Sequence, residues 1–420
     1  MLRGKTVMVG VTGGIAAYKT AALCSMLVKQ GADVHAVMTE SAVRFVAPLT
    51  FETLTGNRAV TDMFDRNFEW DVKHISLAKS ADLIIISPCT ANTLAKLVSG
   101  IADNMLTATV LAADCPKLLS PSMNTGMLAN PVTRDNIKKA REYGFTVIDP
   151  VCGRLACGDV GEGKSPEPEY LLESILREIA RQKDLAGKRI LITAGGTAEA
   201  LDPVRYIGNR SSGRMGCAIA RAAMLRGADV TLIHGVMDIS PPSFVTAVAA
   251  ESARDMFAAV QEHYADMDII IKAAAVADYT PALAQEEKIK KSAQLTIELQ
   301  STDDIALWLG QNKRPEQILV GFAAETCNTE QNAMAKLQSK NLDMIVANQI
   351  SADNPVFGND YNRAAIIGKD GIQQLERMSK SELADVILDG IGGNHNRRAF
   401  LGCMKGQGCI SEDFNEPISV

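Results

Sequence analysis

The sequence twice shows the pattern of a buried strand that runs into a Gly-Gly turn. Residues 6–19 read TVMVGVTGGIAAYK and residues 189–199 read RILITAGGTAE. In both, an apolar run of strand length precedes the glycines, and a helix is expected to start directly after them. Such a turn aims backbone N–H groups and the positive end of the helix dipole at one point, which suits a phosphate. The repeat predicts two α/β domains that each hold a phosphorylated ligand. A tight turn that binds nothing is the alternative for either copy, since neither is a complete G-x-G-x-x-G or Walker A motif.

Strand and helix patterns alternate after each of these openings, which predicts parallel strands joined by right-handed crossovers. In the first half we expect strands at 5–11, 34–38, 82–87, 116–121 and 145–148, and helices at 15–30, 91–99 and 131–143. In the second half we expect strands near 188–194, 229–234, 268–272, 317–322 and 342–347, and helices at 212–226, 252–263, 329–340 and 379–389.

Three segments interrupt this alternation. Residues 150–168 are rich in glycine and proline, which predicts a long loop before a helix at 168–182. A charged link then places a domain boundary near residue 184, with domains at 1–183 and 184–392. An extra strand is expected at 294–299. Residues 393–420 carry little periodicity and are expected to form a loosely ordered tail.

The bulk composition excludes several classes of protein. A chain of 420 residues is too long for one ordinary core, which agrees with two domains. The net charge of −6 argues against a nucleic-acid-binding face, and no apolar run reaches the roughly 20 residues that a membrane span needs. The first residues enter a strand without a signal-peptide pattern, and nine scattered cysteines indicate reduced thiols. Together these features predict a cytoplasmic protein.

Polar side chains follow the expected strands of the first half, where open α/β sheets bind ligands. Thr12, Gly13 and Gly14 follow the first strand, and Thr39 follows the second. An acidic residue at the position of Thr39 would suit an adenosine ribose, so Thr39 argues against NAD. The remaining candidates at these strand ends are Ser87, Thr90, Asn92, Thr93 and Met123. Their hydroxyls and backbone N–H groups fit one phosphate, as in a mononucleotide, although each Ser or Thr alone is explained as a helix N-cap.

Three further residues in this half have side chains suited to acid–base or carboxylate chemistry. His74 is expected at the start of a helix, where the dipole favours neutral imidazole and hence a base; a packed histidine is the alternative. Asn124 can offer its amide to a carboxylate, or can cap a helix. Cys157 lies in the glycine-rich segment, where its thiol could donate a proton or be inert.

At this point the motifs resemble known families. The segments GVTGGIAAYK, WDVKHISLA, ANTLAK and PSMN are similar to those of the homo-oligomeric flavin-containing cysteine decarboxylases. The later segment DPVRYIGNRSSGRMG resembles phosphopantothenate–cysteine ligases. Their fusion, over residues 4–390, resembles the bifunctional coenzyme A biosynthesis enzymes of bacteria. The resemblance implies two Rossmann-like α/β domains: an N-terminal flavodoxin-like flavin domain and a C-terminal ligase domain.

For the first domain, the resemblance implies an FMN-dependent decarboxylase of 4′-phosphopantothenoylcysteine that yields 4′-phosphopantetheine. Oxidation of the carbon that bears the thiol gives a thioaldehyde, which can accept the electron pair that remains when CO2 leaves. His74 matches the active-site base, Asn124 the residue that holds the carboxylate, and Cys157 the proton donor of the later reduction. The segments that carry Thr12, Gly13, Gly14, Thr39, Ser87, Thr90, Asn92, Thr93 and Met123 match the flavin contacts. Cys89-Thr90 replaces the family's usual Ala-Ser, and Leu128 replaces a common aromatic residue.

For the second domain, the resemblance implies that CTP activates 4′-phosphopantothenate as an acyl-cytidylate, which cysteine then attacks. Lys288 matches the catalytic lysine, and Arg205 and Asn209 match residues that act on the acyl-cytidylate. Asp278 is expected to hold Mg2+ or the ribose. The nucleotide-binding set is Ala275, Asp278, Lys288, Asp303, Asp304, Ile305, Ala306, Phe322, Lys336 and Lys340. A solvated surface charge is the alternative for each lysine, and Asp303 stands where the family commonly has proline.

The partners implied are small molecules: 4′-phosphopantothenate, cysteine and CTP. The resemblance also implies a homo-oligomer with trimeric flavin domains and dimeric ligase domains, up to a dodecamer. Two alternatives belong to other classes. One is an FMN- or NAD(P)-dependent oxidoreductase with two Rossmann-like domains. The other is a flavin-binding regulatory subunit without catalysis, which the joint presence of His74, Asn124 and Cys157 disfavours.

Overall fold

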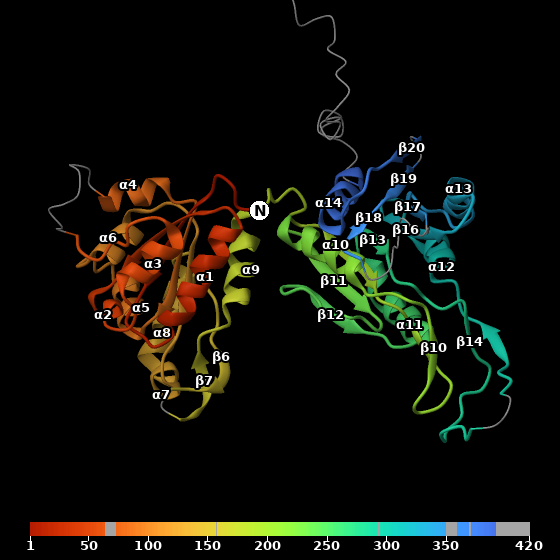
Figure 1. Ribbon diagram of the computed structural model, residues 1–420, viewed down its shortest axis with the longest axis horizontal. Helices are drawn as coiled ribbons and strands as arrows, with labels where there is room; N and C mark the ends of the chain where they lie inside the picture. Colours follow the sequence, from red (N-terminus) through yellow and green to blue (C-terminus); the bar gives the residue numbers. More distant parts are fainter. Residues whose placement is uncertain (64–72, 157, 292–294, 350–358, 369–370, 392–420) are drawn as a thin grey trace, which may run out of the picture. The chain divides into compact units, whose positions relative to one another are not determined.

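The computed structural model describes the chain except residues 64–72, 157, 292–294, 350–358, 369–370 and 392–420, and the described residues form two compact units (Figure 1). The first unit comprises Met1–Arg189 with two short segments, 223–230 and 241–246. The second comprises Ile190–Ala222, Thr231–Ser240 and the described residues from Ala247 onward. The expected tail at 393–420 lies outside the described residues. The helices of the described residues include none with the length and apolar character of a membrane span.

The first unit is built on a five-stranded parallel sheet in the order β2-β1-β3-β4-β5. The strands are β1 (Thr6–Val11), β2 (Asp33–Met38), β3 (Leu83–Cys89), β4 (Lys117–Pro121) and β5 (Thr146–Val147). This is the flavodoxin-like doubly wound order, which reverses direction between β1 and β3. The five strands expected from sequence are all present, and the predicted flavodoxin-like fold is confirmed.

Helices cover both faces of this sheet. On one side α1 (Ala17–Lys29) packs against α3 (Pro48–Thr55) and α9 (Pro168–Ile179). On the other, four helices enclose a core that contains Ile84, Leu94 and Leu106: α4 (Lys73–Ser80), α5 (Ala91–Val98), α6 (Met105–Ala112) and α8 (Pro131–Glu142). Two short helices, α2 (Glu40–Val43) and α7 (Thr125–Ala129), follow strand ends.

The prediction of a long loop at 150–168 is wrong. This segment forms an antiparallel hairpin of β6 (Val151–Arg154) and β7 (Val160–Lys164). Its glycines mark close approach of backbones: a Cβ atom on Gly163 would lie 2.1 Å from the carbonyl oxygen of Met123, and one on Gly161 would lie 2.7 Å from Oγ1 of Thr125. The glycines therefore let the hairpin lie directly against residues 123–125.

The second unit contains an eight-stranded sheet in the order β12-β11-β8-β13-β16-β17-β19-β20. Its first six strands follow the order 3-2-1-4-5-6 of a Rossmann fold, which confirms the second predicted α/β domain. Strands β8, β13, β16 and β17 are parallel, and β19 and β20 add an antiparallel edge. The strands are β8 (Arg189–Ala194), β11 (Asp229–His234), β12 (Thr246–Ala249), β13 (Ile269–Lys272), β16 (Ile318–Glu325), β17 (Met344–Gln349), β19 (Ala364–Gly368) and β20 (Gly371–Gln374).

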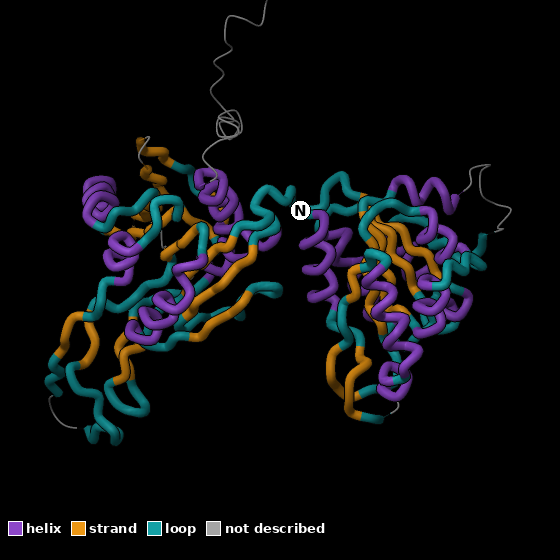
Figure 2. The backbone as a smooth tube through the Cα atoms, turned by 180° about the vertical axis from the view of Figure 1, so that it is seen from behind, coloured by secondary structure: helices purple, strands orange, loops and turns teal. Residues whose placement is uncertain are grey.

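The helices expected in the second half are present with small differences at their ends, and a helix also starts after Asp304, as the Asp303–Ala306 segment predicts. They are α10 (Arg214–Leu225), α11 (Ala253–His263), α12 (Ile305–Asn312), α13 (Thr329–Ser339) and α14 (Lys380–Ile391). Three two-stranded ribbons complete the unit: β9 (Ala198–Ala200) with β10 (Tyr206–Gly208), β14 (Tyr279–Pro281) with β15 (Leu299–Ser301), and β18 (Tyr361–Asn362) with β21 (Met378–Ser379). The first two ribbons extend away from the large sheet as an arm (Figure 2).

Two predictions for this half are wrong. The second Gly-Gly turn leads into strand β9, and α10 begins only at Arg214. The backbone N–H of Gly196 donates to the carbonyl of Val236 at 3.0 Å, so it is not free for a phosphate. The extra strand expected at 294–299 lies later in the chain: β15 begins at Leu299 and pairs with β14 as far as Pro281, which has no backbone N–H to donate. Residue 294 lies outside the described residues.

Candidate functional site

The edge of the first sheet where β1 and β3 end is tied together by Thr12. Its Oγ1 donates to the carbonyl of Pro88 at 2.6 Å and accepts from the backbone N–H of Thr90 at 3.1 Å, and the side chain is fully buried. Gly13 allows another close approach, since a Cβ atom there would lie 2.4 Å from that of Ser41. The Thr12–Gly14 turn and the start of α1 therefore lie at the strand-order reversal, the place where such sheets bind ligands.

Several candidate hydroxyls at this edge act as helix caps. Thr39 caps α2 by accepting from the N–H of Ala42 at 3.3 Å. Thr90 caps α5 by accepting from the N–H of Thr93 at 3.4 Å, and its hydroxyl lies 3.2 Å from that of Thr93. The capping alternative raised from sequence is thus realised. Because these caps fix the starts of α2 and α5, they also fix where the helix dipoles point.

Two serines at the same edge carry buried hydroxyls without a partner. Ser87 near the end of β3 and Ser120 near the end of β4 are both fully enclosed, and neither Oγ has a hydrogen-bond partner in the described part of the chain. Buried hydroxyls are nearly always paired, so a polar ligand is expected nearby. Ser87 was a predicted flavin contact. Ser120 was missed, and the signal for it was a lone polar residue inside an apolar strand.

The third strand end is joined to the β6–β7 hairpin. Asn124 caps α7 by accepting from the N–H of Gly126 at 2.8 Å, and its Nδ2 donates to Asp159 at 3.4 Å. The N–H of Met123 donates to the carbonyl of Gly163 at 3.0 Å. The hairpin is therefore anchored beside Asn124, and the connection between β6 and β7 contains position 157, where the predicted Cys157 lies outside the described residues.

The remaining candidate residues of this unit differ in how far their side chains are buried. His74 is the second residue of α4 and half-buried, while Asn92 is exposed in the first turn of α5. Cys89 is fully buried, and burial raises its pKa to about 12, so its thiol is not a candidate nucleophile. Leu128, at the position where an aromatic is common, is buried at the end of α7.

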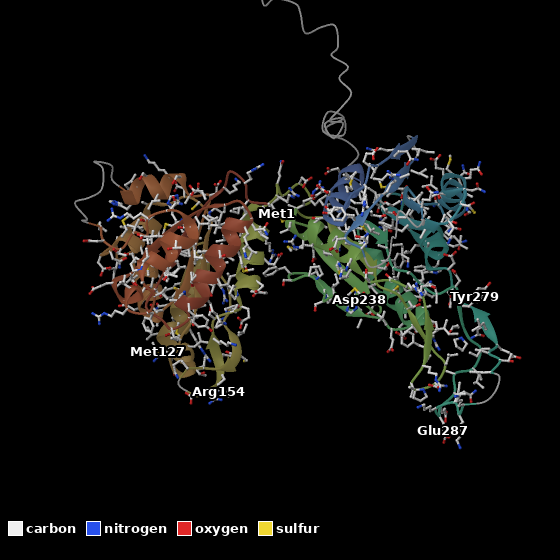
Figure 3. The ribbon with its side chains drawn as sticks, in the orientation of Figure 1. Met1, Met127, Arg154, Asp238, Tyr279 and Glu287 are labelled. Carbon is white, nitrogen blue, oxygen red and sulfur yellow. The ribbon has the colours of Figure 1, made fainter. Side chains whose placement is uncertain are left out.

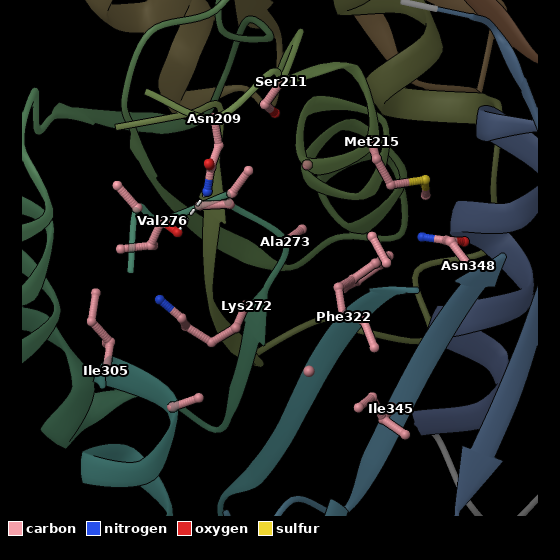
Figure 4. A pocket seen from close by; sticks show the side chains of 18 of the residues that line it. Asn209, Ser211, Met215, Lys272, Ala273, Val276, Ile305, Phe322, Ile345 and Asn348 are labelled. Carbon is pink, nitrogen blue, oxygen red and sulfur yellow. Dashed lines mark hydrogen bonds between the residues drawn. The ribbon is translucent and has the colours of Figure 1, made fainter. Parts of the chain in front are cut away.

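A cavity of about 760 Å3 opens in the second unit at the carboxyl ends of β13 and β16 (Figure 4). Its walls come from the loop before α10, the segment after β13, the start of α12 and the C-terminal half of α13. It is lined by every predicted nucleotide-binding residue except Lys288, together with Asn209: Ala275, Asp278, Asp303, Asp304, Ile305, Ala306, Phe322, Lys336 and Lys340. The sequence-based set is thus largely brought together in one place.

Positive charge predominates on the wall of this cavity. Six cationic residues line it (Arg210, Arg214, Lys272, Lys336, Lys340 and Lys380) against three acidic ones (Asp278, Asp303 and Asp304). Lys340 pairs with Asp304 at 2.8 Å, Lys336 with Glu325 at 2.6 Å, and Arg214 with Asp360. Burial acts to raise the pKa of Asp304, but the hydrogen bond and charge of Lys340 and the N–H groups of Leu307 and Ala306 together outweigh it and hold that pKa below its usual range.

Two helices begin at the cavity. Asp304 caps α12 by accepting from the N–H groups of Ala306 and Leu307 at 3.1 and 3.0 Å. The start of α10 follows Gly213, whose φ of +73° is the left-handed conformation that glycine tolerates best. Helix starts attract anions through their dipoles and free N–H groups. The cavity therefore combines six basic side chains with two helix N-termini, which suits a ligand with several negative charges.

Lys272 was missed by the sequence analysis. It is the last residue of β13 and 8% exposed, and its Nζ has no hydrogen-bond partner among the described residues. Burial lowers its pKa to about 7. The sequence signal is a single lysine between the apolar runs III and AAA, at the end of an expected strand. Arg210, Arg214 and Lys380 were also missed as cavity residues.

Arg205 and Lys288 do not line the cavity. Both are exposed on the arm formed by the β9–β10 and β14–β15 ribbons, whose tip carries Glu287 (Figure 3). Arg205 donates to the carbonyl of Ile289 at 3.2 Å, and buried Asp202 accepts from the N–H of Ile289 at 3.1 Å. Arg205 and Lys288 are thus neighbours, whereas Asn209, which donates to the carbonyl of Val276 at 2.9 Å, lies at the cavity rim.

Asp278, the predicted metal ligand, is exposed in the cavity wall. No cluster of three or more His, Cys, Asp or Glu suited to a metal occurs in the described portion of the chain. A single carboxylate nevertheless fits Mg2+, which commonly takes one or two protein carboxylates and completes its shell with waters and substrate phosphates.

Comparisons with known proteins cover both units. The family model named Flavoprotein matches residues 1–180, and the model named DNA/pantothenate metabolism flavoprotein C-terminal domain matches residues 185–393. The coenzyme A biosynthesis bifunctional protein CoaBC of Bacillus subtilis is 46% identical, over 93% of this chain and 97% of its own. That of Haemophilus influenzae is 42% identical, over 93% of this chain and 98% of its own.

Among solved structures, the C-terminal domain of a coenzyme A biosynthesis bifunctional protein CoaBC is 45% identical, covering 50% of this chain and 95% of its own with a TM-score of 0.43. A PPC decarboxylase mutant complexed with pantothenoylaminoethenethiol is 33% identical, covering 41% of this chain and 97% of its own with a TM-score of 0.38. The full-length identity to the bacterial relatives decides the assignment: this chain belongs to the family of bifunctional coenzyme A biosynthesis proteins.

Proposed function

We propose that this enzyme ligates cysteine to 4′-phosphopantothenate with CTP in its second domain, and decarboxylates the product with FMN in its first. The observation that carries the proposal is the cationic cavity, because it gathers nine predicted nucleotide-binding residues in a chain whose full length matches bifunctional relatives. We place the domain boundary near residue 184, between the segments that the two family models match.

In the ligase domain, the proposed task is to bring two anions together. A carboxylate is a poor acyl donor, and conversion to an acyl-cytidylate gives it a good leaving group. The triphosphate and the attacking carboxylate repel each other, so the cations and helix starts of the cavity are needed to offset their charge. We assign Asp278 to a nucleotide-bound Mg2+, Lys336 and Lys340 to the nucleotide, and Phe322 to the wall beside it.

The proposed roles of Arg205 and Lys288 require the arm to meet a cavity. We propose that ligase domains pair as dimers and flavin domains as trimers, which gives the arm of one copy a second copy to contact. Light scattering on the full chain tests this part separately. A mass of several chains is expected, and a mass of one chain would exclude the proposed assembly.

In the decarboxylase domain, we propose that FMN binds where β1 and β3 end. Its phosphate would lie at the Thr12–Gly14 turn and the start of α1, and Ser87 and Ser120 would give their unpartnered hydroxyls to its polar atoms. When bound, the flavin supplies the electron acceptor that a cysteine carboxylate lacks. His74 would remove a substrate proton, Asn124 would hold the carboxylate through its amide, and Cys157 would return a proton.

One experiment tests both halves. Purified protein is incubated with 4′-phosphopantothenate, cysteine, CTP and Mg2+, while pyrophosphate and CO2 are measured separately. We expect both products, with pyrophosphate formation dependent on CTP and abolished by EDTA. Supplying 4′-phosphopantothenoylcysteine directly should give CO2 without CTP. Absence of pyrophosphate in the first reaction would exclude the ligase, and absence of CO2 in the second would exclude the decarboxylase.

A further inference from the structure

Lys272 stands apart from the other lysines of the cationic cavity. Its side chain leaves the end of β13 and extends between Val276 and Ile305 (Figure 4). Lys336 and Lys340 are each neutralised by a carboxylate, at 2.6 and 2.8 Å. Lys272 is more deeply buried than either, yet its Nζ has no hydrogen-bond partner within the described residues.

A buried ammonium without a partner is costly, because it has lost water and gained nothing in exchange. The charged groups that act on Lys272 are Asp304, at the start of α12, and Lys340, at the end of α13, and they oppose each other. Asp304 is itself engaged by Lys340 and by two backbone N–H groups. The acceptor that would satisfy Lys272 is therefore absent from its protein neighbours and is expected from a ligand in the cavity.

We propose that Lys272 is a nucleotide-contacting residue: its Nζ donates a hydrogen bond to an oxygen of the bound nucleotide, and the amine takes up a proton as the nucleotide binds. This inference rests on the proposed ligase function. The oxygen belongs either to the phosphate chain or to the cytidine, and either offers the amine a hydrogen-bond acceptor.

The proton uptake follows from the change of environment. In the free cavity, burial lowers the pKa of Lys272 to about 7, so at pH 8 most molecules carry the neutral amine. An acceptor oxygen beside Nζ favours the ammonium and raises that pKa. One proton then moves from the buffer to the amine for each nucleotide bound, and no bond to the nucleotide forms or breaks. Asp278, Asp303 and Lys336 also line the cavity, but the charges that shift the pKa of Lys272 are those of Asp304 and Lys340.

Calorimetric titration of the full protein with CTP and Mg2+ at pH 8, in two buffers of different ionisation enthalpy, measures affinity and proton uptake together. Wild type is expected to take up most of one proton. Lys272→Met should bind CTP about 10- to 100-fold more weakly, the range expected for one hydrogen bond to a charged group, and should lose that uptake. Lys272→Gln keeps a donor but cannot titrate, so it should bind with intermediate affinity and also without uptake.

Lys188→Met is the matched control, because Lys188 is exposed just before β8 and outside the cavity; it should behave as wild type. Titrations with CMP and cytidine distinguish the two oxygen sources. If Lys272→Met also weakens the binding of cytidine, the acceptor oxygen belongs to the nucleoside. If it weakens the binding of phosphorylated ligands alone, the acceptor oxygen belongs to the phosphate chain.

Equal CTP affinity and equal proton uptake in wild type and Lys272→Met would overturn the inference while leaving the ligase proposal intact. A variant that binds CTP normally but loses affinity for 4′-phosphopantothenate would also overturn it. If wild type itself fails to bind CTP, the ligase proposal fails and this inference fails with it.

Discussion

The two sheets present their ligand edges with different chemistry, although both follow doubly wound topologies. The β1–β3 edge of the first unit is rich in hydroxyls and backbone turns, and most of its polar groups bind one another. The cavity of the second unit concentrates six basic side chains. The proposed ligands differ in the same way: FMN carries one phosphate and a large, weakly polar ring, whereas CTP carries several negative charges. The difference indicates that the topology sets where a ligand binds, and that the side chains at the strand ends set how much charge the site tolerates.

The sharpest test of two separate chemistries is His74→Asn. Loss of a general base typically costs 10²- to 10⁴-fold in rate, so release of CO2 from 4′-phosphopantothenoylcysteine should fall by about that factor. Pyrophosphate formation should stay at the wild-type rate because the cavity of the second unit does not include His74. Loss of both activities in a folded variant would show that the two regions depend on each other.

The reciprocal test is Lys288→Gln. Removing one positioned charge from a developing anion costs about 3–4 kcal/mol, or roughly 100- to 1000-fold in rate. Formation of the acyl-cytidylate, followed by mass spectrometry of quenched reactions, should slow by that factor while decarboxylation is kept. Lys290→Gln is the control, since Lys290 is exposed on the same segment. Wild-type rates in the Lys288 variant would remove this residue from the activation step.

The buried Lys272 amine in the cationic cavity should lower the free energy of unfolding, an effect without a counterpart at the β1–β3 edge of the first unit. Lys272→Met should unfold at a higher temperature than wild type below pH 7, where the buried amine is protonated in both folded and unfolded chains. Between the folded-state pKa of about 7 and the ordinary lysine pKa of 10.5, each pH unit removes about 1.4 kcal/mol of that destabilisation. The advantage of Lys272→Met in unfolding free energy, a few kcal/mol below pH 7, should therefore shrink as the pH rises and vanish above pH 10.5. Equal melting curves of the two proteins at pH 6.5 would contradict the assignment of a costly ammonium.

The smallest expected effect concerns the hydroxyl edge. Thr12→Val leaves the carbonyl of Pro88 and the N–H of Thr90 without their buried partner, which should cost about 1–3 kcal/mol of unfolding free energy. Thr53→Val is the control, because the hydroxyl of exposed Thr53 only bonds a carbonyl of its own helix, at 2.8 Å. Chemical denaturation with bound and removed flavin would measure both variants; a Thr12 variant as stable as the control would argue that the edge does not depend on this side chain.

Sequence reasoning predicted the sheets well because their strands are short, continuous apolar runs between helical patterns. It failed where the same residue type occurs in two different kinds of structure. The glycines of 150–168 indicate close packing against residues 123–125, and a loop has the same composition. The second Gly-Gly turn matches the first up to the glycines. Gly196 then pairs with Val236 and Ala275, and a strand follows in place of a helix.

The candidate sites divide in a similar way. Nine of the residues predicted to bind the nucleotide could be named because the resemblance carried them over one by one, and the fold brings these nine together in one cavity. Lys272 could not, since a lysine at a strand end gives no sign of its burial or of the missing partner for Nζ. The separation of Lys288 from the cavity also depends on the arm, and pairing between β14 and β15 is set by contacts distant in sequence.

Asp202 has a mechanical consequence. Its buried carboxylate accepts from the N–H groups of Val204, Arg205 and Ile289 at 2.8, 2.9 and 3.1 Å, so it joins two segments more than 80 residues apart. These hydrogen bonds hold the backbone of Arg205 beside the backbone that follows Lys288. Any movement of the arm therefore moves both residues together, and under the roles proposed for them both would approach or leave the substrate as a single part.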